Sequence, residues 1–295
     1  MKIRFLILAA FFCNLPTVFA TVYSGSDCGA TQNDTCNWSY DDQTKTLTIT
    51  GSGKIKDYPK EESPFYNPNE TSSKWRTTAP WGQYNHEVQN INIASGITEL
   101  GEGVFRGMDQ VTSVKLPDGL ETIGASTFDT ALSLKNINIP QSVSSIGNRA
   151  FASTVNLESI NIPDSVVSLG VSAFEVNEEL YGSSSTQSIV LGDGVTTIGK
   201  NTFTGMSENL IIFCSDKGHE DNSCQQILQK TGFKGQIQQY TKISTNLYSV
   251  IQNGKTSYYS SMTKMAQNIE MKRIYTIDEA NMVAGKKNTF KIRYK

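Results

Sequence analysis

One apolar motif recurs through the middle of this chain at a step of 23 residues. The phenylalanines that carry this step are Phe105, Phe128, Phe151 and Phe174, with Phe203 following after 29 residues. An aliphatic-Gly pair keeps the same step, at Leu100-Gly101, Ile123-Gly124, Ile146-Gly147, Leu169-Gly170 and Ile198-Gly199. A period of roughly 20–30 residues is the signature of a stacked solenoid, and the leucine-rich repeat lies in that range. We therefore expect a β-rich repeat solenoid of the leucine-rich-repeat type, a short right-handed stack with one parallel strand per turn.

Each repeat also contains two aliphatic residues that alternate with polar ones, as the third repeat, residues 134–156, shows. Ile137 and Ile139 are two apart, so both point to one side of a short strand, which we expect to be the core side. Gly147 permits a tight bend, and Phe151 fills the core behind the strand. A single turn buries too little apolar surface to be stable, so stacking is required.

The residues that alternate with these aliphatics should form the outward face of the strand ladder. One row holds Asn90, Ser113, Asn136, Ser159 and Ser188, and the next holds Asn92, Lys115, Asn138, Asn161 and Val190. Such small hydrogen-bonding groups suit a carbohydrate or a protein backbone, and we take these two rows as the candidate ligand-binding surface. The alternative is that they only solubilise an exposed sheet, since no large aromatic residue anchors the strip.

The first 20 residues have the pattern of a secretory signal peptide. Lys2 and Arg4 give the positive start, Ile3–Phe12 is the apolar stretch, and Val18–Ala20 resembles a small-residue cleavage site, so we expect cleavage after Ala20. The apolar stretch is shorter than the roughly 18–20 residues of a membrane anchor. A lipid anchor on Cys13 is disfavoured because two phenylalanines precede it. The prediction is a protein that is secreted or held at the cell surface or in the periplasm, without a transmembrane segment.

Cleavage would leave four cysteines in two local pairs, Cys28 with Cys36 and Cys214 with Cys224. An even count in an exported protein predicts disulfides, and three pairings are possible. The local pairing is favoured because the two pairs flank the repeats on opposite sides. The alternative is a metal site built from Cys214, His219 and Cys224, which lacks a fourth ligand. We expect structural disulfides, no metal and no cofactor.

The chain divides into five parts by composition. They are a signal peptide (1–20), a β-rich N-terminal cap (21–87), the solenoid of five repeats plus a sixth strand (88–215), a C-terminal cap (216–250) and a basic strand-helix-strand tail (251–295). Residues 21–250 hold 15 basic and 25 acidic side chains, whereas the tail holds nine and three. A basic tail could touch an anionic surface such as a membrane, a cell-wall polymer or the acidic body.

The N-terminal cap should contain two strands, around Asn37–Tyr40 and Leu47–Thr50, with Gly51-Ser52-Gly53 breaking the second. A proline-rich loop follows at 57–82, and its Trp75 and Trp81 should cover the first repeat. Three Asn-x-Ser/Thr sequences, at Asn33, Asn37 and Asn69, would be glycosylation sites only in a eukaryotic host.

Beyond the repeats, a helix is expected at 225–231, and in the tail strands at 273–275 and 290–294 flank a helix at 278–284. Repeat four carries six extra residues around 178–185. Such insertions in solenoids form loops, and this one either contacts a ligand or is a tolerated surface insertion.

The repeat Ile-x-Ile-Pro-x-Ser-Val-x-Ser-Ile-Gly-x-x-Ala-Phe, seen best at 137–151 and 160–174, resembles the BspA-like leucine-rich-repeat family. A Leu-Thr-Ile-x-Gly-x-Gly element at 47–53 and the Pro80-Trp81 pair extend the resemblance to residues 36–215. The resemblance implies a secreted or surface protein that binds other proteins or cells, often as an adhesin, and no catalytic residues.

Catalytic motifs are missing from the sequence. The Gly51–Lys54 stretch ends like a phosphate-binding loop but lacks its first glycine and its Ser/Thr, and His86 and His219 are far apart. We therefore expect no enzyme, and no nucleic-acid partner for an acidic body. The leading hypothesis is an adhesin-like binding protein for a protein or glycan ligand. The alternatives are a structural envelope protein attached by its basic tail and, remotely, a hydrolase with an unrecognised site.

Overall fold

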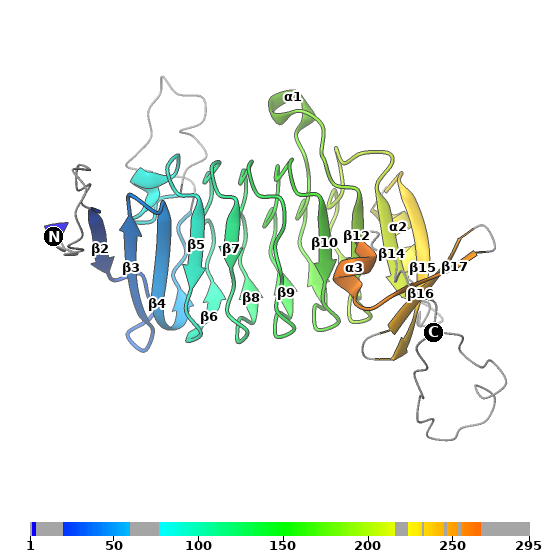
Figure 1. Ribbon diagram of the computed structural model, residues 1–295, viewed down its shortest axis with the longest axis horizontal. Helices are drawn as coiled ribbons and strands as arrows, with labels where there is room; N and C mark the ends of the chain where they lie inside the picture. Colours follow the sequence, from blue (N-terminus) through cyan, green and yellow to red (C-terminus); the bar gives the residue numbers. More distant parts are fainter. Residues whose placement is uncertain are drawn as a thin grey trace, which may run out of the picture.

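Figure 1 shows an elongated stack of turns that lie side by side along the long axis. The computed structural model describes residues 2–3, 20–59, 77–215, 224–231, 233–244, 247–252 and 255–266. Residues 4–19, which hold most of the predicted signal peptide, lie outside this set, as do Trp75, Asn69, His219 and the predicted tail elements at 273–294.

The front of the stack is a ladder of parallel strands, one to most turns. They are β5 (Asn90–Ile93), β7 (Ser113–Lys115), β10 (Ser159–Ile162), β12 (Ser188–Leu191) and β14 (Ile211–Ser215). Equivalent aliphatic residues are in register, so Ile160 lies beside Ile189 and Ile189 beside Ile212. In the third repeat, Ile137 and Ile139 are buried as predicted, but residues 135–140 do not form a hydrogen-bonded strand.

A second ladder of short parallel strands runs along the neighbouring side of the coil. It consists of β6 (Ile97–Leu100), β8 (Thr122–Ile123), β9 (Ser145–Ile146), β11 (Ser168–Leu169) and β13 (Thr197–Ile198). The aliphatic-Gly pairs build this ladder, because each aliphatic residue ends or lies within a short strand and the glycine follows it. The solenoid is confirmed, and the structure adds this second strand to each turn.

The repeated glycine is needed for close packing between turns, not for a special backbone angle. A Cβ atom on Gly147 would lie 2.6 Å from the backbone nitrogen of Ala125 in the preceding turn. The same conflict arises at Gly170, where a Cβ would lie 2.4 Å from Asn148 N. Neither glycine has a positive φ. The repeated glycine is therefore explained by the close approach of two backbones and not by the tight bend that we predicted at Gly147.

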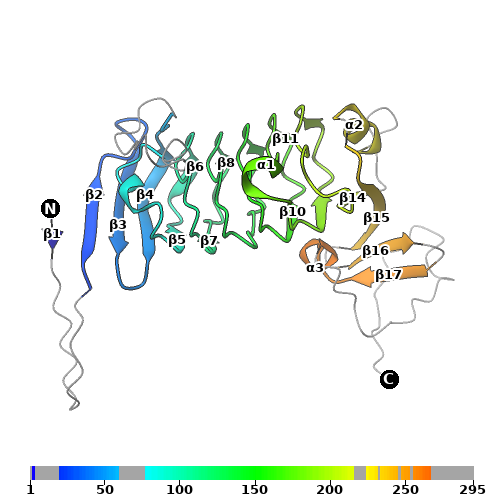
Figure 2. The same cartoon turned by 90° about the horizontal axis from the view of Figure 1, so that it is seen from above.

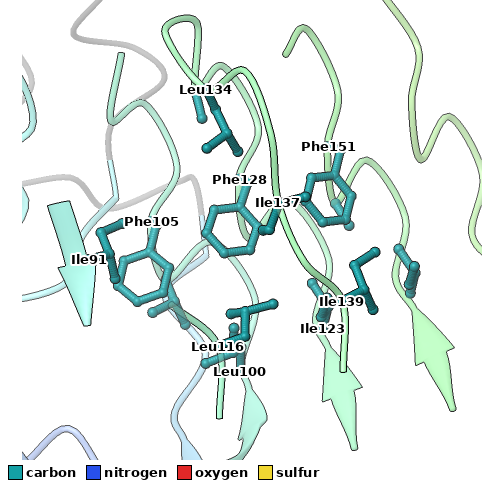
Figure 3. Close-up of a cluster of buried hydrophobic side chains, with 14 of the residues drawn as sticks. Ile91, Leu100, Phe105, Leu116, Ile123, Phe128, Leu134, Ile137, Ile139 and Phe151 are labelled. Atoms are coloured by element: carbon teal, nitrogen blue, oxygen red, sulfur yellow. The ribbon is translucent and has the colours of Figure 1, made fainter. Parts of the chain in front are cut away.

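The phenylalanines stack into a continuous column inside the coil, as Figure 3 shows for Phe105, Phe128 and Phe151. Centroid distances between successive rings of the five repeats run from 5.3 to 6.1 Å. Trp81 closes the N-terminal end of the column at 6.1 Å from Phe105, with its indole N–H donating to Val104 O at 2.9 Å. The prediction that Trp81 covers the first repeat is confirmed.

The N-terminal cap is an antiparallel extension of the front ladder. Its strands are β1 (Lys2–Ile3), β2 (Val22–Ser26), β3 (Thr35–Asp41) and β4 (Thr46–Ile55). A short 3-10 helix, η3 (Gly82–Tyr84), packs Tyr84 against Tyr40, with ring centroids 4.4 Å apart.

Strand β4 is not broken at its glycines, contrary to the sequence prediction. Residues 46–49 pair with β5 in the front ladder, and residues 53–55 pair with β6 in the second. Gly51 and Gly53 have φ angles of 131° and 84°, which L side chains rarely adopt. The glycines therefore bend one strand around the corner so that it starts both ladders.

The C-terminal part turns back over the front of the stack. It contains α2 (Cys224–Lys230), β15 (Gln236–Ser244), β16 (Leu247–Gln252), β17 (Lys255–Tyr259) and α3 (Met262–Ala266). β15 pairs in parallel with β14, and β16 and β17 follow antiparallel. Figure 2 shows β16, β17 and α3 on the side of the stack that carries β5, β7 and β10. The predicted helix at 225–231 is confirmed by α2.

Candidate binding surface

The two predicted polar rows lie on one face, the outward face of the front ladder. Register places Asn90 beside Ser113 and Asn92 beside Lys115, each in neighbouring turns. The exposed residues of these rows are Asn92, Ser113, Lys115, Asn136 and Asn138, and we call the part of the face from β3 to Asn138 the open face. Asn90, Ser159 and Asn161 are half-buried. Neighbouring strands lie about 4.8 Å apart, so the face repeats hydrogen-bonding groups at that interval.

The outward face is longer at its N-terminal end than the sequence analysis proposed. Thr46 and Thr48 of β4 lie beside Asn90 and Asn92, and Ser39 of β3 lies beside Thr48. Ser24 of β2 continues this row. The alternation Thr46-Leu47-Thr48-Ile49-Thr50 was the available signal, because its leucine and isoleucine are fully buried and its threonines are not.

At the C-terminal end the outward face is covered, which corrects the prediction of an exposed strip along its whole length. Ser188 is only 5% exposed and Val190 is fully buried. Helix α3 contacts both β10 and β12. Asn161 Oδ1 is buried beneath this end of the face, with no hydrogen-bond partner among the described residues.

A second small core fills the space between the outward face and the returning chain. Its buried members are Val190, Phe213, Tyr240, Tyr248, Val250, Tyr259, Met262 and Met265. Tyr240 donates a hydrogen bond to Leu191 O at 3.2 Å, and Lys242 forms an ion pair with Asp164. Burial, together with nearby Asp193, raises the pKa of Tyr240. We call residues 236–266 the C-terminal cover, because they close the front ladder from β12 onward.

Charges near the open face are mostly held in local contacts. The Asp41 carboxylate accepts hydrogen bonds from the backbone N–H groups of Gln43 and Thr44, at 2.9 and 3.0 Å, and so fixes the β3–β4 turn. Glu87 accepts from Lys45 Nζ at 3.0 Å, and this hydrogen bond raises the pKa of Lys45. The open face therefore offers amides and hydroxyls with few free charges.

Both predicted disulfides are present. Cys28 is bonded to Cys36 and Cys214 to Cys224. Cys214 lies in β14 beside Leu191 and is buried, and its disulfide ties α2 to the end of the stack. The cysteines of the alternative metal site are thus used in a structural bond.

The insertion in repeat four folds into the short helix α1 (Glu178–Tyr181), which projects from the stack (Figure 1). Asn177 caps it by accepting a hydrogen bond from Leu180 N at 3.2 Å. Leu180 is 64% exposed at its tip. At its base, Arg149 forms ion pairs with Asp129 Oδ2, 3.1 Å from its Nε, and with Glu175 Oε2, 3.0 Å from its Nη1. The insertion lies away from the outward face.

The histidine that the structure describes is hydrogen-bonded to a carboxylate at the surface. His86 Nδ1 lies 2.9 Å from both carboxylate oxygens of Asp109. Within the described part of the chain, no cluster of three His, Cys, Asp or Glu residues could hold a metal ion. None of the helices in that part is both long enough and apolar enough to span a membrane.

The family model of the BspA type leucine rich repeat region matches six copies of the repeat, over residues 83–180 and 175–279. The chain belongs to the BspA-type leucine-rich-repeat family. This confirms the resemblance drawn from the repeat residues.

Two solved bacterial proteins that resemble this chain each share 18% identity with it. A leucine-rich repeat protein from Eubacterium ventriosum covers 80% of the chain with a TM-score of 0.49, and a leucine rich cell surface protein from Faecalibacterium prausnitzii covers 76% with a TM-score of 0.37. The alignments take in 48% and 58% of those two proteins, so this BspA-type chain spans only about half of their length. No curated protein matches the chain.

Proposed function

We propose that this BspA-type protein acts outside the cell, secreted or at the cell surface, and binds a protein or glycan ligand in an adhesin-like manner. The observation that carries the proposal is the polar face that is aligned in register from β3 to β7 and continues with exposed Asn136 and Asn138 in the third repeat. Asn92, Lys115 and Asn138 present amide and ammonium groups from successive turns. A ligand with repeated hydrogen-bonding groups would meet several of them at once, and such multiple contacts raise overall affinity.

The family and the disulfides support this placement. Two disulfides fit an oxidising environment outside the cytoplasm, and the predicted signal peptide agrees with it. The solenoid offers an extended surface without a catalytic constellation on the described residues, which favours binding over chemistry.

A binding array on the exported protein tests the proposal. Matrix proteins, mucins and glycans would be probed at physiological salt with the parent protein and with Asn138→Arg, which places a large charged side chain on the open face. Asn209→Arg is the matched control, because Asn209 is exposed in the turn before β14 and not on the outward face. We expect a ligand whose binding is lost in Asn138→Arg and kept in Asn209→Arg. A ligand that still binds both variants would show that the open face is not the binding surface.

A second candidate, a structural envelope protein, is favoured by the charge of residues 251–295, which hold nine basic and three acidic side chains. Truncation after Ala266 would release such a protein from the envelope without loss of the solenoid. Retention of the truncated protein at the envelope would count against this role.

A further inference from the structure

At the N-terminal end of the front sheet, part of strand β2 has no strand partner among the described residues, and we call this side of β2 the open edge. β2 pairs with β3 along one edge through five residue pairs. On its other edge, only Lys2 and Ile3 among the described residues pair with it, opposite Tyr23 and Val22. Ser24–Ser26 therefore has no strand partner on that side within the described part of the chain.

The hydrogen bonds at the start of β2 show which backbone groups point to this edge. Asp42 N–H donates to Thr21 O at 3.2 Å, so the groups of Thr21 face β3. In an antiparallel pair, alternate residues direct their N–H and C=O groups to the same neighbour. Tyr23 and Gly25 therefore bond to β3, and Ser24 directs its N–H and C=O to the open edge.

This edge lacks the features that usually prevent strand pairing between molecules. Proteins protect sheet edges with charged side chains, proline or bulges. The sequence Val22–Ser26 has no charge and no proline, and its pairing with β3 is regular. At the opposite end of the front sheet, β17 contains Lys255 and leads directly into α3.

We propose that the open edge of β2 pairs with β2 of a second copy of this chain, antiparallel about a twofold axis at Ser24. The two residues Lys2 and Ile3 already pair antiparallel there, which shows that the edge accepts a strand in this direction. Cleavage after Ala20 would remove these residues and free the edge along its whole length. An antiparallel strand paired with itself is self-complementary, as a twofold interface requires.

The side chains of β2 fit this pairing. A twofold axis at Ser24 sets Tyr23 of one copy opposite Gly25 of the second copy. Gly25 has no side chain, and the indole of Trp38 lies directly behind it, since an added Cβ would lie 2.6 Å from Trp38 Nε1. An aromatic ring opposite a glycine is a favourable cross-strand arrangement. Tyr23, which is half-buried, already packs on Tyr84 with centroids 5.1 Å apart, so the pairing would extend that aromatic cluster.

The dimer joins the two polar faces into one continuous sheet, because the outward rows of both copies lie on the same side of the paired strands. A strand of five residues gives a small interface, so the dimer forms in a concentration-dependent way. Crowding of copies on a surface would favour it. The inference does not depend on the proposed ligand.

Light scattering coupled to size-exclusion chromatography tests the pairing on the exported protein. Mass spectrometry first identifies the N-terminal residue of that protein. We expect the mass to rise towards twice that of the monomer as concentration increases. Ser24→Pro should stay monomeric at all concentrations, because it removes an N–H from the open edge and leaves the β3 bonds intact. Ser24→Lys should also be monomeric, since like charges would lie opposite each other at the axis.

Ser24→Ala is the control and should dimerise like the parent protein. Unchanged circular dichroism and unfolding midpoints in all three variants would show that they fold. A parent protein that stays monomeric at its highest soluble concentration overturns the proposal. So does a dimer that persists in both Ser24→Pro and Ser24→Lys.

Discussion

The rings of Phe151 and Phe174 stack with centroids 5.3 Å apart and planes only 2° from parallel. Both side chains are almost completely buried, and they occupy the middle of the aromatic column. Each ring contacts the ring above and the ring below, so the column couples every turn to its neighbours. Solenoid stability depends on such contacts between adjacent turns.

Replacement of Phe151 by alanine should therefore lower the free energy of unfolding by about 3–5 kcal/mol, through lost burial and the cavity left behind. Denaturant unfolding followed by circular dichroism measures this loss. Asn136→Ala, in the same repeat but exposed, should change stability by less than about 0.5 kcal/mol. A loss below about 1 kcal/mol for Phe151→Ala would show that neighbouring turns collapse into the cavity.

Gly147 gives a sharper test of turn-to-turn packing. An alanine there must push against Ala125 N, because its Cβ would lie only 2.6 Å away, and we expect a loss of about 1–3 kcal/mol. Gly119→Ala is the matched control, since its Cβ would meet nothing closer than Ser95 O at 3.7 Å and its φ is not positive. That variant should be as stable as the parent protein or slightly more stable. Equal losses in the two variants would contradict the packing explanation.

The sequence predicted the repeat because its inward residues recur at fixed positions, as Phe105, Phe128 and Phe151 do. It did not predict the backbone two residues before each phenylalanine. There the chain adopts a positive φ in every repeat, at Gly103, Ser126, Arg149, Ser172 and Asn201. Four of these residues are not glycine, so the residue types did not indicate a positive φ at these positions. The conformation is imposed by stacking, because each turn must follow the path of its neighbour.

The open face was predicted because alternation along a strand separates inward from outward residues. The covering of Ser188 was not predicted, since it depends on residues 236–266 folding back across the stack. One signal was present: the outward positions that hold Asn161 in repeat four hold Val190 and then Phe213 in the next two strands. An apolar residue at an outward position indicates that another part of the chain covers it.

Val190 tests whether the C-terminal cover is held by this small second core. Val190→Asp would bury a carboxylate among apolar side chains, which is strongly unfavourable. We expect faster hydrogen exchange in β16 and β17 while β5 and β7 keep their protection. Asn138→Asp, on the open face, should leave both regions unchanged. Protection of β16 and β17 that survives Val190→Asp would mean that the cover is held elsewhere.

The disulfide between Cys28 and Cys36 joins the start of β3 to the loop before it. The two cysteines are eight residues apart, and a loop of that size restricts the unfolded chain by about 2–3 kcal/mol. Replacing both by alanine should lower the unfolding free energy by that amount. A reductant breaks both disulfides of the parent protein, whereas the double variant lacks only this bond. Comparing the unfolding free energies therefore separates the contribution of Cys28–Cys36 from that of Cys214–Cys224. If the double variant matched the parent protein under oxidising conditions, the bond would have no role in stability.

The aromatic cluster of the N-terminal cap should make the protein sensitive to alkaline pH. Burial raises the pKa of Tyr40 to about 12, with Glu87 adding to the effect, and burial raises the pKa of Tyr84 to about 12 as well. In the unfolded chain a tyrosine titrates near pH 10. Between these values the unfolded state has lost the proton that the folded state keeps, so stability is complete below about pH 10 and falls as pH rises towards 12.

Unfolding midpoints measured from pH 8 to pH 12 should therefore decline above pH 10. Tyr40→Phe removes one titrating group, and the decline should become less steep in that variant even if its stability at pH 8 is lower through loss of the 3.2 Å hydrogen bond to Glu87. Asn138→Ala, which lies outside the cluster, should follow the parent protein throughout. A Tyr40→Phe curve that runs parallel to the parent curve would show that Tyr40 titrates alike in both states and that the alkaline sensitivity arises at another group.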